Sequence, residues 1–185
     1  MSRKEILKSL EDAPFKGPSL PDYNFGNPKA SSLLAKFTAS AKISATQIVE
    51  KKDIVDLADK YPKVINLSSE IAYKGLDLSQ FKSPYELVDI DLVILDGVFG
   101  VAENGAIWVE SDGWPFRVLP FITEHLVICI KKENLVDNMH DAYAKIEADE
   151  YDFGVFIAGP SKTADIEQSL VIGAQGPRSM GVLLV

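Results

Sequence analysis

In the stretch Asp91-Leu92-Val93-Ile94-Leu95 the last four residues are all apolar, so side chains on both faces of a strand here are suited to burial. A strand of this kind is typical of a parallel sheet that is covered on both sides. Leu126-Val127-Ile128-Cys129-Ile130 repeats the pattern further along the chain. Each run therefore predicts a buried strand of a parallel sheet in an α/β fold.

Segments with helical and strand-like periodicity alternate around these two runs. The pattern predicts helices at 31–41, 53–61, 135–146 (with Asn134 as cap) and 164–171, and strands at 46–49, 64–67, 106–109, 153–158 and 180–185. Strands that alternate with helices indicate crossover connections. We therefore expect an α/β fold of three layers, with a mostly parallel sheet and helices on both faces.

The first 28 residues differ from the rest of the chain. Ser2 and Glu5 have capping-box spacing, and Ile6, Leu7 and Leu10 fall on one helical face. Residues 13–28 are rich in proline and glycine and predict an irregular arm. The domain prediction is an N-terminal helix and arm over 1–28, followed by an α/β domain over 29–185. The arm either makes a homo-oligomer contact, drapes over the domain, or is a frayed tail.

Composition restricts the class of protein. The net charge of −8 argues against broad nucleic-acid binding, which requires a basic surface. The chain has neither an apolar stretch of the roughly 20 residues that cross a bilayer nor a signal-peptide core, so it predicts no membrane partner. The single Cys129 cannot form an internal disulfide, which favours a reducing compartment. We expect a cytoplasmic protein.

Metal and cofactor motifs are missing from the sequence. The chain contains two histidines, His125 and His140, and one cysteine, without metal-ligand spacing. We interpret both histidines as structural or solvated. The phosphate-loop and dinucleotide patterns are absent too. The sequence therefore predicts no metal site and no cofactor.

A loop after the predicted strand at 153–158 has the parts of an anion site. Gly159-Pro160-Ser161-Lys162-Thr163 combines a turn, two hydroxyls and a positive charge, and the predicted helix that follows would add free N–H groups. Asp165 and Glu167, in the first turn of that helix, would repel an anion. The alternative interpretation is a well-capped connection without a ligand. Asp165 is also a candidate for proton transfer.

A second loop, Gly173 to Arg178, follows the same predicted helix. Gln175 and Gly176 lie in it, and the fork of Arg178 suits a carboxylate or phosphate. Arg178 could equally pair with Asp165 or Glu167. We therefore include Gln175, Gly176 and Arg178 among the candidate ligand-binding residues.

A third candidate segment is the turn at 102–106. Glu103 beside Gly105 could act as a general base, a nucleophile or an acceptor for a ligand hydroxyl. A glutamate in such a position more often caps an element or faces water. Glu103 and Asp165 are the candidate catalytic residues, and Gly105, Gly159, Ser161, Lys162 and Thr163 complete the predicted binding site.

Three segments of this chain together resemble the LUD (lactate-utilisation) domain family, of which lactate utilisation protein C is typical. The family has an Ala-Glu-Thr-Gly-Thr-like turn, a Leu-Pro...His segment, and the signature Gly-Pro-Ser-x-Thr-Ala-Asp-Ile-Glu...Gly-x-His-Gly-Pro. These motifs appear here as Ala102 to Ala106, as Leu119-Pro120 with His125, and as Gly159 to Glu167 with Gly173 to Arg178. The resemblance covers about residues 30 to 185. Gln175 replaces the family histidine of the last loop, and Ala106 replaces a threonine.

The resemblance implies a fold like that of ribose-phosphate isomerase and coenzyme A transferases (NagB/RpiA/CoA transferase-like). It also implies a role in oxidising L-lactate to pyruvate beside iron-sulfur redox partner proteins. If the family histidine does acid-base work in relatives, Gln175 can form hydrogen bonds but cannot titrate in its place.

Two functional hypotheses follow. The first is a non-redox component of lactate utilisation that binds a small anionic metabolite at the strand C-terminal loops. The second is a non-catalytic interaction module that docks a redox partner. A stand-alone isomerase, transferase or cyclo-ligase rests on fold analogy alone. Whether the chain is itself an enzyme is left open.

Overall fold

A computed structural model describes residues 3–4, 8, 30–111, 113–146, 153–163 and 171–185. The predicted arm at 13–28 and nearly all of the predicted N-terminal helix lie outside these residues. Asp165, Glu167 and most of the predicted helix at 164–171 lie outside them as well. Among the residues described, no helix is both long enough and apolar enough to cross a membrane.

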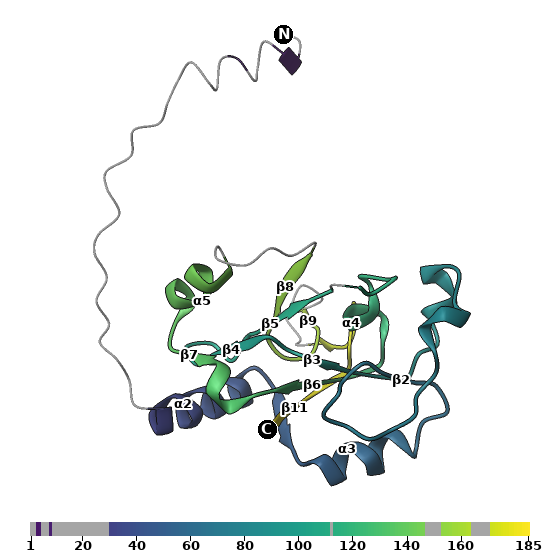
Figure 1. The fold of residues 1–185 in the computed structure, drawn as a ribbon, viewed down its shortest axis with the longest axis horizontal. Coiled ribbons are helices and arrows are strands. Elements are labelled where there is room, and N and C mark those ends of the chain that lie inside the picture. Colours follow the sequence, from purple (N-terminus) through teal and green to yellow (C-terminus); the bar gives the residue numbers. More distant parts are fainter. Residues whose placement is uncertain (1–2, 5–7, 9–29, 112, 147–152, 164–170) are drawn as a thin grey trace.

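The described residues form a five-stranded parallel sheet in the order β1-β11-β6-β3-β2 (Figure 1). The strands are β1 (Thr46–Val49), β2 (Val64–Asn66), β3 (Leu92–Asp96), β6 (His125–Ile130) and β11 (Ser179–Leu184). The two runs that predicted the fold pair directly, with Val93 opposite Leu126. Residues 92–95 and 126–130 of these runs are all buried, because the strands occupy interior positions of the sheet.

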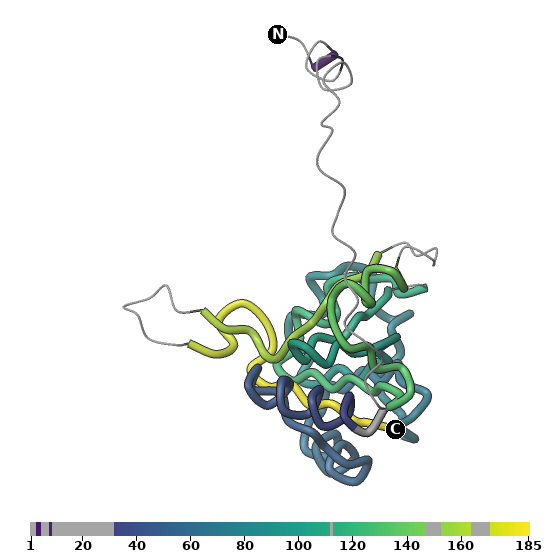
Figure 2. Tube along the Cα trace, turned by 90° about the vertical axis from the view of Figure 1, so that its left-hand side faces the viewer, coloured from purple at the N-terminus to yellow at the C-terminus, as the bar shows by residue number. Residues whose placement is uncertain are grey.

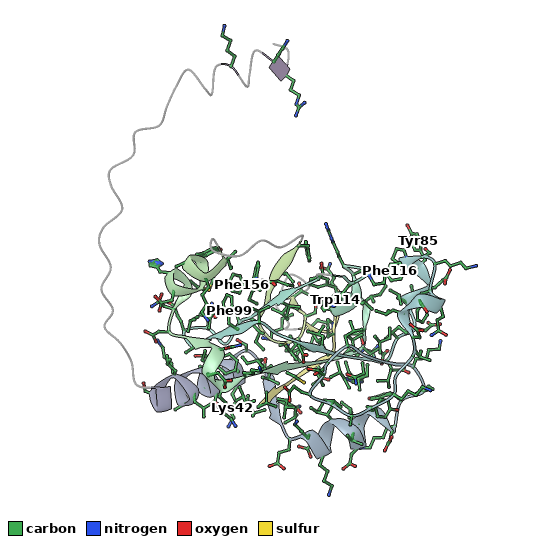
Figure 3. All side chains as sticks on the ribbon, in the orientation of Figure 1. Lys42, Tyr85, Phe99, Trp114, Phe116 and Phe156 are labelled. Atoms are coloured by element: carbon green, nitrogen blue, oxygen red, sulfur yellow. The ribbon has the colours of Figure 1, made fainter. Side chains whose placement is uncertain are left out.

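A second sheet of four strands, in the order β7-β4-β5-β8, packs on one face of the first. Its strands are β4 (Phe99–Val101), β5 (Ile107–Glu110), β7 (Leu135–Val136) and β8 (Gly154–Ile157). Ile107 and Val109 of β5 share a core cluster with Val93 and Leu95 of β3. Phe99 and Phe156 belong to the second sheet, with ring centroids 6.1 Å apart (Figure 3).

Helices cover both faces of the parallel sheet, so the predicted α/β class is confirmed. Helix α2 (Ala30–Ile43) buries Phe37 and Ala41 on the same face as the second sheet. Helix α3 (Lys51–Ala58) buries Ile54 and Ala58 against the opposite face. Alternate side chains of β3 point to the two faces, which explains why the whole run is apolar. Helix α5 (Met139–Ile146) packs on the second sheet.

Short elements complete the described chain. They are the 3-10 turns η1 (Leu78–Gln80), η2 (Pro84–Leu87) and η3 (Lys132–Asn134), helix α4 (Leu119–Ile122), and strands β9 (Lys162–Thr163) and β10 (Val171–Ile172). Strands β9 and β10 pair antiparallel, and Figure 2 shows them projecting from the body of the domain.

Two predicted helices need correction. The helix at 135–146 begins only at Met139, and Leu135 instead lies on β7, opposite Gly100 of β4. The cap is Asn138, whose side-chain oxygen accepts from the N–H groups of His140 and Asp141 at 2.9 and 3.0 Å. An apolar residue at helical spacing cannot by itself be distinguished from one on a short preceding strand. The predicted helix at 164–171 is wrong at its last residue, because Val171 lies on β10.

Candidate functional site

A cavity of about 310 Å³ opens at the edge of the parallel sheet where β3 and β6 end. The polar and charged residues that line it are Ser69, Glu70, Asp96, Lys131 and Asn134. Open α/β sheets bind ligands at the carboxyl ends of their strands. The volume is at the lower end of the range typical of small-molecule sites. This carboxyl-edge pocket is the candidate functional site.

The carboxylate of Asp96, the last residue of β3, is held by the loop that follows β2. The Ser68 hydroxyl donates to Asp96 Oδ1, and the Ser69 N–H and hydroxyl donate to Oδ2 at 3.2 and 3.3 Å. A carboxylate offers about four lone pairs, so these donors leave acceptor capacity for a ligand. Asp96 is therefore oriented as a hydrogen-bond acceptor in the pocket.

Asn66, at the end of β2, gives this loop its shape. Its side-chain amide donates to the carbonyls of Ile71 and Tyr73, both at 2.9 Å, and its oxygen accepts from the Ser68 N–H at 3.1 Å. Gly75 passes so close that a Cβ there would lie 2.6 Å from the Val64 carbonyl oxygen. The loop is thus pinned to β2, which fixes the two serines against Asp96.

The pocket carries positive as well as negative charge. Glu70 pairs with Lys51, with 3.3 Å between Oε2 and Nζ. Lys131 follows β6 at the rim, and the Asn134 amide donates to the Val98 carbonyl at 2.9 Å. A carboxylate acceptor and an ammonium donor therefore line the same cavity.

Cys129 contributes to the pocket wall as a buried thiol. Burial raises its pKa to about 11, and the negative charges of Asp96 and Glu70 act in the same direction. The thiolate is the reactive form of cysteine. At neutral pH the protonated Cys129 therefore serves as a small apolar side chain.

The structure brings the two predicted anion loops together around Ser161. Its N–H donates to the Pro177 carbonyl at 3.0 Å, its carbonyl accepts from Gly173 at 2.9 Å, and its hydroxyl accepts from the Gln175 N–H at 3.3 Å. Gly176 lies beside Ser161, since a Cβ there would be 3.2 Å from Ser161 Cβ. The two loops form one unit held by backbone hydrogen bonds.

Lys162, Gly159 and Gly105 all contact the C-terminal end of α2. The Lys162 ammonium donates to the Ser44 carbonyl, where a positive charge is favoured by the helix dipole. Gly159 has a φ of 80°, and a Cβ there would lie 2.0 Å from the Ser44 carbonyl oxygen. Gly105 approaches Ala41 in a similar way. These contacts give the three residues a packing role, and Thr163 lies beyond them on β9.

Arg178 and Glu103 have partners that the sequence did not predict. Arg178 pairs with Glu124 at 3.5 Å, and it precedes β11, so it lies at the amino edge of the parallel sheet. The Glu103 carboxylate accepts from the Met139 N–H at 3.0 Å, at the start of α5. The carboxyl-edge pocket is lined by neither residue. Their predicted ligand-binding and catalytic roles, like that of Asp165, stay predictions.

His125 joins Tyr61 and Ser179 at the amino edge. Its Nε2 lies 2.6 Å from the Tyr61 hydroxyl, and its Nδ1 lies 2.7 Å from the Ser179 hydroxyl. Burial lowers the pKa of His125, and the positive charge of Arg178 lowers it further, while Glu124 and Asp91 oppose the shift. The neutral ring is therefore favoured in the folded protein.

The lowered pKa of His125 predicts a loss of stability in weak acid. As the pH falls below about 6.5, the ordinary pKa of histidine, His125 is protonated in the unfolded chain but not yet in the folded one. The free energy of unfolding therefore decreases as the pH falls, until the pH passes the lower pKa of the folded state. Thermal melts between pH 8 and 5 should show a smaller decrease for His125→Gln than for wild type. His140→Gln, at an exposed position of α5, is the matched control. Equal slopes in wild type and His125→Gln would contradict the prediction.

Comparison with known proteins places the chain in a family. The model of the LUD domain matches residues 79–185, more than half of the sequence. This chain belongs to the LUD domain family. The match includes the ends of β3 and β6 and thus much of the carboxyl-edge pocket.

Curated relatives of this LUD-domain chain carry the name lactate utilization protein C. The protein of Bacillus pumilus is 36% identical over 93 residues, which cover 47% of this chain and 39% of the relative. That of Oceanobacillus iheyensis is 30% identical over 92 residues, which cover 46% of this chain and 39% of the relative. That of an Exiguobacterium strain is 31% identical over 118 residues, which cover 59% of this chain and 50% of the relative. The chain thus spans about two fifths of the first two relatives.

A solved structure shares the fold. The crystal structure of a DUF162 family protein from Deinococcus radiodurans aligns with a TM-score of 0.63 at 14% identity, and covers 86% of this chain and 99% of that one. The likeness supports the α/β architecture described above.

Proposed function

We propose that this LUD-domain chain is a non-redox component of lactate utilisation that binds a small hydroxylated carboxylate in the carboxyl-edge pocket. The names of the relatives support the metabolic role. The observation that carries the binding site is the oriented Asp96 carboxylate in a cavity that also contains Lys131.

The chemistry of the pocket matches a 2-hydroxy acid. The ligand hydroxyl would donate to Asp96, where three donors leave about one of four lone pairs available. The ligand carboxylate would pair with Lys131 and accept from the second N–H of the Asn134 amide, since both residues line the cavity. Hydrogen bonds that involve a charged group are about twice as strong as those between neutral groups. The two charged contacts would therefore favour a ligand that has both a hydroxyl and a carboxylate.

The oxidation step would belong to partner proteins. A chain with one cysteine cannot supply the thiolates that an iron-sulfur cluster needs. The protonated Cys129 is poorly suited to thiol redox chemistry as well. We therefore propose iron-sulfur redox partners, as the family resemblance implies, with this chain presenting or retaining the small acid.

Calorimetric titration against L-lactate, pyruvate, glycerate, a sugar phosphate and coenzyme A tests the proposal. We expect binding of L-lactate or glycerate, and about tenfold weaker binding of pyruvate, which has no hydroxyl to donate to Asp96. Absence of heat from every acid would contradict ligand binding and favour the interaction module.

A further inference from the structure

We propose that the ligand of the carboxyl-edge pocket extends into a neighbouring apolar groove, so that its class is a 2-hydroxy acid with an aliphatic chain of several carbons. The groove has a volume of about 450 Å³. Its apolar lining comes from α2, β1 and the segment 183–185, and consists of Leu34, Ile48, Val49, Leu183, Leu184 and Val185. The inference rests on the proposed function, because it lengthens the ligand proposed for the same pocket.

The groove lies at the same edge of the parallel sheet as the pocket. The pocket opens where β3 and β6 end, and the groove opens where β1 and β11 end, beside α2 (Figure 1). In the strand order β1-β11-β6-β3 these are adjacent pairs of strands. Strand β11 pairs directly with β6, with Leu184 opposite Ile130. The two cavities therefore lie side by side along one edge.

Val185 lines both cavities and forms the boundary between them. Its N–H donates to the Ile130 carbonyl at 3.0 Å, and its carbonyl accepts from the Lys132 N–H at 2.9 Å, so its backbone is fixed at the end of β6. An aliphatic chain can cross this apolar side chain without burying a polar group. Lys51 of the groove and Glu70 of the pocket also meet across the boundary, where they neutralise each other at 3.3 Å.

The spacing of the strands sets the length of chain that reaches the groove. Neighbouring strands are about 4.8 Å apart, so the end of β11 lies roughly 5 Å from that of β6, and the end of β1 roughly 10 Å. An extended tail of about six carbons, with single bonds of roughly 1.5 Å, spans about 7–8 Å and passes the end of β11. The methyl group of lactate is one bond long and stays in the pocket.

The lining of the groove favours an aliphatic tail over a charged one. Leu34, Ile48 and Leu184 are only half-buried, and contiguous apolar surface of this kind is typical of ligand-binding grooves. The charged lining residues Glu50, Lys51 and Lys132 are exposed and include both signs, so they select neither an anionic nor a cationic extension. The groove therefore provides burial for methylene groups rather than an ion pair.

Calorimetric titration of the full chain with L-lactate, 2-hydroxyhexanoate and 2-hydroxyoctanoate tests the inference. Each methylene buried in the groove should tighten binding about twofold to fourfold, so 2-hydroxyoctanoate should bind at least roughly thirtyfold more tightly than lactate. Thr38→Glu places a carboxylate in the groove and should abolish this gain with chain length. Ala39→Glu, at an exposed position of the same helix, is the matched control and should preserve the gain.

Three results would overturn the inference, and they separate it from the proposed function. Equal affinity for lactate and 2-hydroxyoctanoate in the wild type would remove the groove from the site and leave the proposed function standing. Tight binding of 2-hydroxyoctanoate that Asp96→Asn does not weaken would show that the groove holds the tail without the pocket. Absence of binding by acids of every length would contradict the proposed function and this inference together.

Discussion

Phe37→Ala should lower the free energy of unfolding by about 3–5 kcal/mol, as is usual when a buried aromatic ring is removed. The ring is fully buried in the largest core cluster. A Cβ on Gly100 would lie 2.9 Å from Phe37 Cε2, so the ring packs directly on the backbone of β4. Removing it would leave a cavity where α2 joins the two sheets.

Urea unfolding measures this loss. Ile43→Ala on the same helix is the matched control, because the Ile43 side chain is 87% exposed and its removal should change stability by no more than about 0.5 kcal/mol. Similar losses in the two variants would show that α2 is not part of the core.

Gly105→Ala should destabilise the domain by roughly 2–5 kcal/mol. The backbone has a φ of 72°, where an L-residue costs about 1–2 kcal/mol. The new Cβ would also lie 2.6 Å from the Ala41 backbone nitrogen, so α2 must move, and overpacking typically costs a further 1–3 kcal/mol.

Gly113→Ala separates the two causes. Gly113 has a φ of 74°, but a Cβ there meets nothing within 4 Å, so only the conformational cost remains. Chemical unfolding should therefore show a larger loss for Gly105→Ala. If the two variants lose equal stability, the close approach of the 102–106 turn to α2 is not significant.

The sequence predicted the central sheet because both faces of β3 and β6 are buried, which requires continuous apolar runs. It did not predict a second sheet packed on the first. Strands β5 and β8 were predicted, but β4 and β7 are short and were not, and Leu135 on β7 matched a helical stripe by chance of spacing. Which strands pair across long sequence separations cannot be seen in a local sequence pattern, because a short strand is recognised only by the partner with which it forms hydrogen bonds.

The candidate site was harder to predict than the fold. Glycines and charges at 159–163 and 173–178 have the composition of a binding site, but the described contacts of Gly159 and Lys162 fix the first of these loops to the end of α2. The carboxyl-edge pocket combines Ser69, Asp96 and Lys131 from three separate segments that form no motif. The available signal was the position of Asp96, an acidic residue directly after the buried apolar run at 92–95. Such a residue lies at the carboxyl edge wherever the strand is parallel.

The most direct test that the ligand binds at the carboxyl edge is calorimetric titration of L-lactate into two variants, Asp96→Asn and Arg178→Gln. Thermal melts confirm that both variants fold. Asp96→Asn removes the charged acceptor in the pocket, and we expect it to weaken binding about tenfold or more. Arg178→Gln removes an exposed ion pair and a charge near His125, both at the amino edge, and should bind as wild type does. Normal binding by Asp96→Asn together with loss in Arg178→Gln would contradict the account and place the ligand at the 173–178 loop.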